Sequence, residues 1–287
     1  MKSKVYFSRD ITPEKVLELY NLTGAELKGR VAVKVHSGEP GNQNFLRPDF
    51  WQPVVEAVQG IVTECNTAYD GGRDTTERHW KTLAAHGWNH YFKVDLLDAE
   101  GPDLELPIPN GKKIKVDYVG KNLVNYDSLL VLSHFKGHPM GGYGGALKQL
   151  SIGVASAYGK KYIHGVGDTV DYWNGEHDSF LEAMADAASV VHERFAGKVA
   201  YINVMKNMSV DCDCCAVAED PCLDDIGILA STDPVAIDQA CLDLVYASHD
   251  PGAPHLIERI ESRNGVHTIE AAAELGVGSR EYELIEI

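Results

Sequence analysis

Hydrophobic and polar positions alternate along the chain with two periods, one typical of strands and one typical of helices. The apolar run at 31–35 predicts a buried strand. Asp49 is then expected to cap a helix over 50–59. A strand-like segment at 61–64 and a helix over 75–86 continue the pattern. The first part of the chain therefore predicts strands and helices in regular alternation.

The rest of the chain repeats this alternation. Strands are predicted at 128–132, 198–204 and 226–230, and a long helix at 178–194. The buried face of that helix is expected to consist of Phe180, Met184, Ala187, Ala188 and Val191. Asp233 followed by Pro234 predicts the start of a further helix, because an acidic N-cap and a proline at the first helical position both favour initiation.

Strand–helix alternation over this length predicts an α/β fold, with a mostly parallel sheet flanked by helices. The whole chain, 1–287, is expected to form one unit of this fold, and the pattern leaves open a division into two lobes. Asn110-Gly111 stands between segments at 104–108 and 113–119 and predicts a hairpin with a type I′ turn. Ligands of such sheets bind beyond the carboxyl ends of the strands, so a site is expected in the loops that follow strands.

The composition and the net charge argue against some classes of binding partner. The chain has 287 residues, of which 44% are hydrophobic, and a formal net charge of −16 at pH 7. This acidic balance lacks the basic footprint of a protein that binds nucleic acid or an anionic membrane. The sequence has no apolar signal segment and no apolar run of about 18 residues, so we expect a cytoplasmic protein without membrane contact.

A glycine-rich loop at 134–148 follows the strand at 128–132 and leads into a helix expected over 146–155. Its candidate catalytic residues are His134, Lys136, His138 and Lys148. Glycine-rich turns before helices cradle anions with backbone N–H groups, and we expect Gly144 and Gly145 to do so here. The loop completes neither a P-loop nor a dinucleotide fingerprint. It favours an anionic-substrate or metal site over a purely structural crossover.

Four of the six cysteines lie close together, at positions 212, 214, 215 and 222. In a reducing compartment such a cluster indicates metal or redox chemistry rather than disulfides, and thiolates bind zinc and iron tightly. The spacing is not that of zinc ribbons or ferredoxins. We interpret Cys212 and Cys214 as the functional pair, with a structural or merely reactive loop as the alternative. Cys241 is expected in the core, and Cys65 is left open.

Acidic residues crowd the same loop, at Asp211, Asp213 and Asp220. Negative neighbours raise the pKa of a thiol, whereas a bound cation deprotonates it. We therefore expect Cys212 and Cys214 to be partly exposed to solvent and either to bind a cation or to face the basic residues of the glycine-rich loop.

Further basic residues follow other predicted elements. His36 comes after the strand at 31–35 and is a candidate metal ligand or general base, although a lone histidine is more often neither. Lys160, Lys161 and His164 form a basic segment after the helix at 146–155, which completes an anion site or is a solvated face. The loops of His36, His134 and Cys212 all follow strands, so we expect them to meet.

Six motifs carry a resemblance to a known family. They are 34–39 (KVHSGE), 66–69 (NTAY), 132–138 (LSHFKGH), 144–148 (GGALK), 212–214 (CDC) and 225–238 (DIGILASTDPVAID). With them the sequence resembles the uncharacterised Fe–S centre protein family, a domain-of-unknown-function family, over nearly its whole length. The shell of site residues that this resemblance implies is His36, His134, Lys136, His138, Lys148, Lys160, His164, Cys212, Cys214 and Asp225.

Members of that family commonly carry a ferredoxin-type insert after the Gly-Lys…His segment, which here is at 159–164. The insert, expected near 165–178, is absent, because no cysteine lies between Cys65 and Cys212. A [4Fe–4S] cluster needs four thiolates in most proteins. The resemblance therefore implies a fold and a site, and we do not expect such a cluster.

The leading hypothesis is a metal-dependent enzyme that acts on a small anionic molecule. Cys212, Cys214 and Asp225, with one or more of the histidines at 36, 134 and 138, would hold zinc or iron. Lysines 136, 148 and 160 would bind the substrate, and the metal would polarise a carbonyl or activate water. A lysine that binds a carbonyl covalently is a further option.

Two other hypotheses belong to different classes. One is a non-catalytic metal or redox protein whose partner protein supplies electrons. The other is a phosphate- or nucleotide-binding regulatory protein. Assembly into a homo-oligomer is left open.

Overall fold

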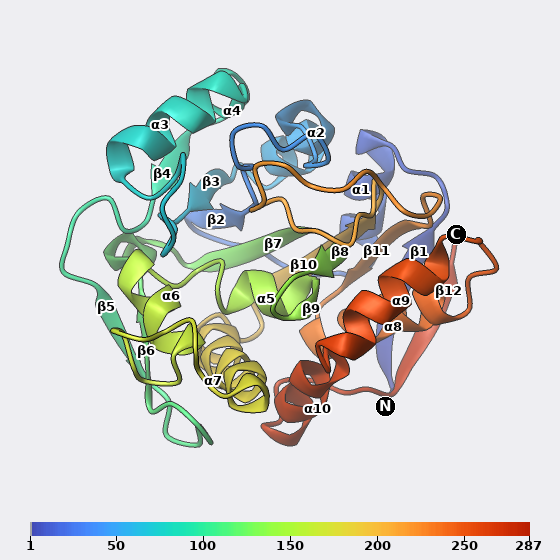
Figure 1. Cartoon of the computed structure of the whole chain (residues 1–287). Helices are drawn as coiled ribbons and strands as arrows, with labels where there is room; N and C mark the ends of the chain where they lie inside the picture. The colour runs from blue at the N-terminus through green and yellow to red at the C-terminus, as the bar shows by residue number, and fades with distance from the viewer. Residues whose placement is uncertain (1) are drawn as a thin grey trace.

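One eight-stranded sheet organises the computed structural model, which describes residues 2–287. In sheet order its strands are β12 (Tyr282–Glu286), β1 (Ser3–Ser8), β11 (Gly227–Ser231), β10 (Val199–Met205), β7 (Ser128–His134), β2 (Val31–Lys34), β3 (Ile61–Glu64) and β4 (Val94–Leu96) (Figure 1). Neighbours are parallel except at β11, which runs antiparallel to β1 and β10. The prediction of an α/β fold with a mostly parallel sheet is confirmed.

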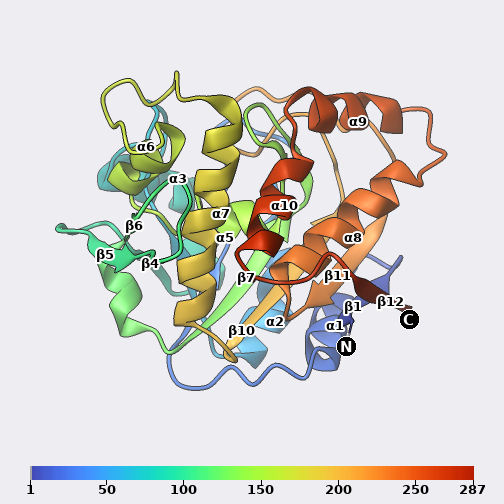
Figure 2. The same cartoon turned by 90° about the horizontal axis from the view of Figure 1, so that it is seen from below.

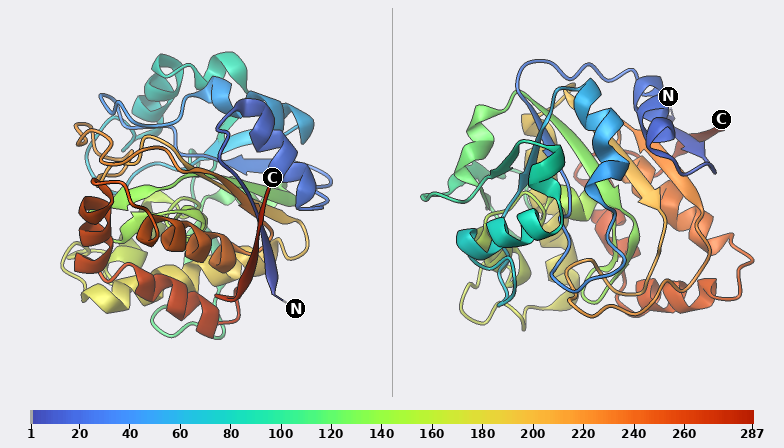
Figure 3. Two further views of the ribbon diagram at one scale, coloured as in Figure 1. Left: turned by 90° about the vertical axis from the view of Figure 1, so that its right-hand side faces the viewer. Right: turned by 90° about the horizontal axis from the view of Figure 1, so that it is seen from above.

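Helices cover both faces of this sheet (Figure 3). One face packs against α1 (Pro13–Leu22), α2 (Pro48–Ala57), α3 (Thr76–Ala85) and α4 (Trp88–Tyr91). The other packs against α5 (Ala146–Leu150), α7 (His177–Arg194), α8 (Pro234–Tyr246), α9 (Ala253–Ser262) and α10 (Val266–Glu274). Figure 2 shows α7, α10 and α8 side by side on this second face. A 3₁₀ helix at Lys121–Asn125 leads into β7.

The central strands are apolar because both of their faces are buried. Along β7, Leu129 and Val131 join the core on the α5 side, whereas Leu130 and Leu132 join the core on the α1 side. The predicted stripe of α7 is buried in full. Asp233 caps α8 by accepting hydrogen bonds from the backbone N–H groups of Val235 and Ala236. None of the helices at 2–287 is both long and apolar enough to cross a membrane.

The predicted hairpin forms, but its connection differs from a type I′ turn. Its strands are β5 (Leu104–Pro107) and β6 (Val116–Val119), and neither Asn110 nor Gly111 has a positive φ. Backbone N–H groups at 112–114 instead donate hydrogen bonds to the carboxylate of Asp186 on α7. This distant carboxylate, rather than the Asn-Gly pair, sets the conformation of the connection.

Two predicted helices have different bounds. Pro48 occupies the first position of α2, so its N-cap is Arg47 and not Asp49. The helix expected over 146–155 ends at Leu150, because Ser151 has a ψ of −85°. Ser156 then caps a separate helix, α6 (Ala157–His164), by accepting a hydrogen bond from Gly159 N. The basic residues at 160, 161 and 164 therefore lie on a helix and not in a segment after one.

Candidate functional site

The loops that follow β2, β3, β7 and β10 enclose a cavity of about 230 Å³. These four strands are parallel, so their carboxyl ends lie at the same edge of the sheet. The charged and metal-ligating side chains that line the cavity are Lys34, His36, Glu64, Cys65, Arg73, His138, Lys148, Lys160, His164 and Cys214. The structure thus brings together the loops of His36, His134 and Cys212, as the positions of the strands suggest.

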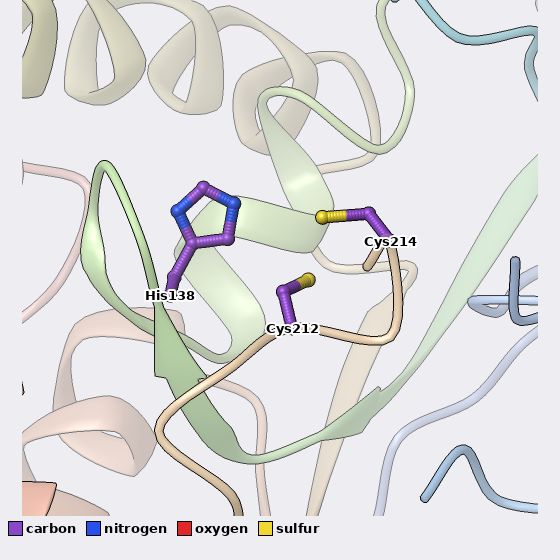
Figure 4. A group of neighbouring side chains, drawn as sticks. All are labelled: His138, Cys212 and Cys214. Carbon is purple, nitrogen blue, oxygen red and sulfur yellow. The ribbon is translucent and has the colours of Figure 1, made fainter. Parts of the chain in front are cut away.

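A thiol–histidine group lies at this cavity. One ligand atom each of His138, Cys212 and Cys214 lies within 4.8 Å of the other two. His138 ends β8 (Lys136–His138), which pairs with β9 (Gly142–Gly144), and both cysteines belong to the turn at 212–215, here called the thiol turn. Figure 4 shows the ring and the two sulfur atoms directed toward one another. Two thiols and one imidazole are a donor set that suits zinc or another soft metal ion.

Neighbouring loops hold the backbone of the thiol turn. The carbonyl of Asp213 accepts a hydrogen bond from Glu39 N (2.9 Å), and that of Cys214 accepts one from the Tyr69 hydroxyl (3.2 Å). The side-chain amide of Asn42 donates to the carbonyl of Cys215 (2.9 Å). The turn is therefore fixed by the loops after β2 and β3, which preorganises the two thiols before any ligand binds.

Both thiols are held in their neutral form. A hydrogen bond with Cys214 and burial raise the pKa of Cys212. Cys212 lowers the pKa of Cys214, but Cys215 and burial outweigh it and the net shift is upward. The prediction that both thiols are partly exposed is wrong for Cys212, which is 1% exposed, whereas Cys214 is half-buried. Neighbouring thiols and burial, more than the acidic residues expected from the sequence, raise these pKa values.

The remaining cysteines do not complete a four-thiol site. Cys222 directs its thiol to the carbonyl of Met208 (3.3 Å), and Cys65 directs its thiol to the carbonyl of Val154 (3.2 Å). Cys241 is buried on α8, as its helical position predicts. Cys215 follows the pair but is not one of the three converging residues. The residues present fit a mononuclear metal better than a [4Fe–4S] cluster, whose absence stays a prediction.

The turn between β8 and β9 fixes the tautomer of His138. Its Nδ1 accepts hydrogen bonds from the backbone N–H groups of Gly141 (2.8 Å) and Met140 (3.2 Å). Burial and the charge of Lys148 lower the pKa of His138 to about 4, so the ring is neutral and carries its hydrogen on Nε2. A metal that binds Nε2 requires this hydrogen to leave and the contacts at Nδ1 to open. The two thiols fit a metal once they lose their protons, and the imidazole fits after this change.

Asp213 places two of the predicted catalytic residues in an ion-pair network. Its carboxylate contacts His134 Nδ1 (2.9 Å) and Lys136 Nζ (3.2 Å), and His134 Nε2 faces the carbonyl of Lys206. Burial would raise the pKa of Asp213, but the contacts with His134 and Lys136 hold it far below its usual range. His134 and Lys136 are buried and do not line the 230 Å³ cavity, so they support the thiol turn from behind.

A second ion-pair network lines the cavity and was not predicted from the sequence. Glu64 Oε2 accepts from Lys34 Nζ (2.5 Å), and Oε1 accepts from Ser37 Oγ (2.9 Å) and Arg73 (3.4 Å). Arg73 also pairs with Glu39 (2.9 Å). Burial raises the pKa of Glu64, but the charges of Lys34 and Arg73 prevail and lower it to about 2. The one available signal was a glutamate at the carboxyl end of a strand.

His36, expected as a metal ligand, lines the cavity beside this network. Its Nδ1 accepts a hydrogen bond from Gly38 N (3.2 Å), and the guanidinium of Arg73 lies 3.5 Å from its Nε2. Burial, followed by the charge of Arg73, lowers the pKa of His36 well below its usual value. The ring is therefore neutral, and it is not among the three residues that converge for a metal.

The opposite wall carries cations without carboxylate partners. Among residues 2–287 no acceptor lies within hydrogen-bonding distance of Lys148 Nζ, and Lys160 Nζ bonds only to the carbonyl of Ala155 (2.6 Å). His164 hydrogen-bonds through Nδ1 to the carbonyl of Lys160 (2.7 Å), which leaves its Nε2 free. All three residues line the cavity, so this wall is suited to an anion.

Asp117 on β6 is a further residue that sequence reasoning missed. It is fully buried, and within the described part of the chain neither of its carboxylate oxygens has a hydrogen-bond partner. Burial raises the pKa of Asp117 to about 8, with Lys160 opposing this shift. The group is thus a neutral acid near Lys160 at neutral pH, and its surroundings in β6 gave no signal in the sequence.

The structure separates three other candidates from the thiol–histidine group. Asp225 pairs with Lys206 (3.1 Å) and accepts from Asn207 N (2.7 Å), and it does not join the converging ligands. Gly144 lies in β9, and the backbone N–H groups after Gly145, at 146 and 147, donate to the buried carboxylate of Asp238. The anion-binding role expected of Gly144 and Gly145 stays a prediction, and a carboxylate of the protein already accepts from the two N–H groups that follow them.

Fold and site together define an α/β protein with a buried thiol–histidine group beside a cationic cavity. The family described as "Domain of unknown function (DUF362)" matches residues 31–243, and the chain belongs to this family. No curated protein matches the sequence. The resemblance found in the sequence is thus confirmed at the level of a family of unknown function.

Two solved structures resemble the chain at low identity. One is the lactate racemase apoprotein from Thermoanaerobacterium thermosaccharolyticum, with 13% identity, a TM-score of 0.42, and coverage of 69% of this chain and 50% of that chain. The other is a Thermotoga maritima protein from a structural genomics consortium, with 11% identity, a TM-score of 0.45, and coverage of 92% and 59%. This chain thus spans about half to three fifths of their lengths.

Proposed function

We propose that this protein is a metal-dependent enzyme that acts on a small anionic molecule. The metal would be held by Cys212 and Cys214, with His138 joining after its Nε2 hydrogen leaves. The anion would be held by Lys148 and Lys160. When bound, a metal at this position supplies a Lewis acid that polarises a carbonyl or activates water.

One observation carries the proposal: two lysines with no carboxylate partner in the described part of the chain line the same cavity as His138 and Cys214. Four cationic side chains line the cavity. Lys34 pairs with Glu64, and Arg73 pairs with Glu64 and Glu39, whereas the lysines at 148 and 160 have no carboxylate partner among residues 2–287. In a chain of net charge −16 this local excess runs against the overall balance. Buried charges are costly unless they are paired, so the buried Lys160, with the half-buried Lys148 in the same cavity, favours an anionic ligand beside the potential metal ligands.

The neutral thiols support a metal rather than a free thiolate. Because their pKa values are raised, neither thiol is an activated nucleophile in the metal-free protein. A bound cation would displace both protons. The charge of Lys136 lowers the pKa of Cys212 and eases this loss.

Metal analysis and anion binding, measured on the same preparations, test the proposal. We expect protein purified without chelators to contain zinc or iron in stoichiometric amount, and Cys212→Ser with Cys214→Ser to lose it. Cys222→Ser is the matched control, because this thiol lies in the same loop but faces Met208. Metal loss should also lower the melting temperature, since ligands that bind only the folded state stabilise it.

The anion half uses acetate and inorganic phosphate as probes in thermal-shift titrations. Lys148→Met with Lys160→Met should abolish the stabilisation by whichever probe binds, and Lys161→Met, next in sequence, should preserve it. Metal binding without any anion effect would contradict the enzyme and favour a non-catalytic metal protein. Metal content that is unchanged in the double cysteine variant would contradict the metal site itself.

A further inference from the structure

We propose that the ligand of this cavity is a small carboxylic acid that carries one compact apolar group, such as an aromatic ring. This inference rests on the proposed function, because it specifies the anion that Lys148 and Lys160 bind. Three observations support it: the apolar surface of the cavity, the size of the cavity, and the fact that nearby backbone N–H groups are already hydrogen-bonded within the protein.

Apolar atoms make up most of the surface of the cavity. The apolar residues that line it are Ala68, Pro139, Met140, Ile152 and Trp173. Trp173 belongs to the segment between α6 and α7 and is 44% exposed, so it reaches from the cavity to solvent. An anion without an apolar group would leave this apolar surface in contact with water and would gain no binding free energy from it.

Aromatic rings continue behind the lysine wall. Trp173 packs edge-on against the ring of His164, with centroids 5.1 Å apart, and His164 stacks on Phe180 at 4.8 Å. The Tyr172 hydroxyl donates to the carbonyl of Ala68 (3.0 Å) and so fixes the segment next to Trp173. The wall thus offers a preformed aromatic edge, against which a further ring packs favourably.

The size of the cavity limits the apolar group. Its volume of about 230 Å³ is larger than the roughly 150 Å³ of a dry cavity that holds benzene. It is smaller than the roughly 300–1,000 Å³ of pockets for drug-sized ligands. One ring with a short acidic arm fits this range, whereas a nucleotide would leave part of itself outside.

The backbone N–H groups at this edge favour a carboxylate over a phosphate. Phosphate sites rely on clustered N–H groups. The candidates at 146 and 147 are already bound to Asp238 (2.7 and 2.9 Å), and Gly72 N is bound to Glu39. The guanidinium of Arg73 is likewise occupied by Glu39 and Tyr69. Two lysine ammonium groups remain, and they can pair with the two oxygens of a carboxylate without an N–H cradle.

Isothermal titration of the purified protein with matched probes tests this inference. Phenylacetate should bind about tenfold or more tightly than acetate, because it buries an additional ring, and more tightly than the neutral phenylacetamide. Phenyl phosphate and AMP should bind more weakly than phenylacetate. Trp173→Ala should reduce the preference for phenylacetate over acetate to a few-fold, and Trp173→Phe should restore it. Trp80→Ala, on α3, is the matched control.

The outcomes separate the two proposals. Equal affinities for acetate and phenylacetate would overturn the apolar group while leaving the anion site in place. Tighter binding of phenyl phosphate or AMP would overturn the carboxylate. Absence of binding by every anionic probe, with the metal present, would contradict the proposed function instead.

Discussion

The two walls of the cavity differ in how their buried charges are compensated. On the side of β2, β3 and the thiol turn, Glu64 and Asp213 each contact two cationic or cation-forming side chains. On the side of α5 and α6, Lys148 and Lys160 have no carboxylate partner among residues 2–287. Lys148 is half-buried and the other charged side chains are buried, and the two sides differ in how these charges are paired.

This difference assigns distinct tasks to the two walls. Removing one partner of a buried ion pair destabilises a protein strongly. The ion pairs of the paired wall therefore hold in place the loops that carry the thiols. The cations of the other wall contribute little to folding, because no carboxylate among residues 2–287 pairs with them. They are the groups that an anionic ligand can engage.

Breaking the paired wall should have the largest effect. Glu64→Gln removes the charge that faces Lys34 and Arg73 and leaves both cations buried. We expect the free energy of unfolding to fall by about 3–5 kcal/mol in urea denaturation at pH 7. The pKa of Glu64 is lowered to about 2, so its contribution is present above about pH 4.5 and is lost as the pH falls toward 2.

Glu77→Gln is the matched control for this prediction. Glu77 pairs with Lys81 at 2.7 Å, but both side chains are exposed to solvent. Its loss should leave the denaturation midpoint nearly unchanged, because solvent screens the pair. Comparable losses of unfolding free energy in the Glu64→Gln and Glu77→Gln variants would show that burial does not make the Glu64 network more stabilising than an exposed ion pair.

Asp117, which is buried near Lys160, gives a pH-dependent prediction. Its pKa is raised to about 8 in the folded state, so folded protein holds this proton while unfolded protein releases it near pH 4. The contribution to stability is therefore full below about pH 4 and is lost as the pH rises to 8. Between pH 5 and pH 8 the loss should be roughly 3 kcal/mol, at 1.36 kcal/mol per pH unit.

Asp117→Asn should remove this slope, since an amide does not titrate. The comparison is the change in unfolding free energy between pH 5 and pH 8, measured for the variant and the unsubstituted protein. Any constant cost of the buried amide cancels in that difference. Identical slopes for the two proteins would mean that Asp117 is ionised in the folded state.

The sequence could predict the fold because apolar periodicity is local. Each central strand is apolar on both faces, and α7 buries the stripe that its spacing indicates. The direction of β11 could not be predicted, because the long connection from β10 permits either direction. The predicted type I′ turn was wrong because the connection depends on a distant contact. The carboxylate that holds it belongs to Asp186, more than 70 residues away.

The candidate site was predictable in its residue types but not in their partners. Cys212, Cys214 and His138 were all candidates, and the structure brings them together. The sequence did not reveal that Asp213 binds His134, 79 positions away. Nor did it reveal that Asp238 accepts from the N–H groups at 146 and 147, directly after the glycines expected to bind an anion. Such pairs depend on how loops pack in three dimensions, which spacing along the chain does not encode.

The smallest expected effects distinguish two adjacent lysines of α6. Lys160→Met keeps an apolar stem of similar length and removes a buried cation without a carboxylate partner. We expect the free energy of unfolding to stay the same or rise by up to about 1 kcal/mol. Lys161→Met removes an ammonium 5.3 Å from the centroid of the Tyr172 ring and should cost about 0.5–1 kcal/mol. Urea denaturation of both variants measures these two changes of opposite sign in the free energy of unfolding. A loss of about 3 kcal/mol for Lys160→Met would contradict the prediction and would show that Lys160 is paired like the cations of the other wall.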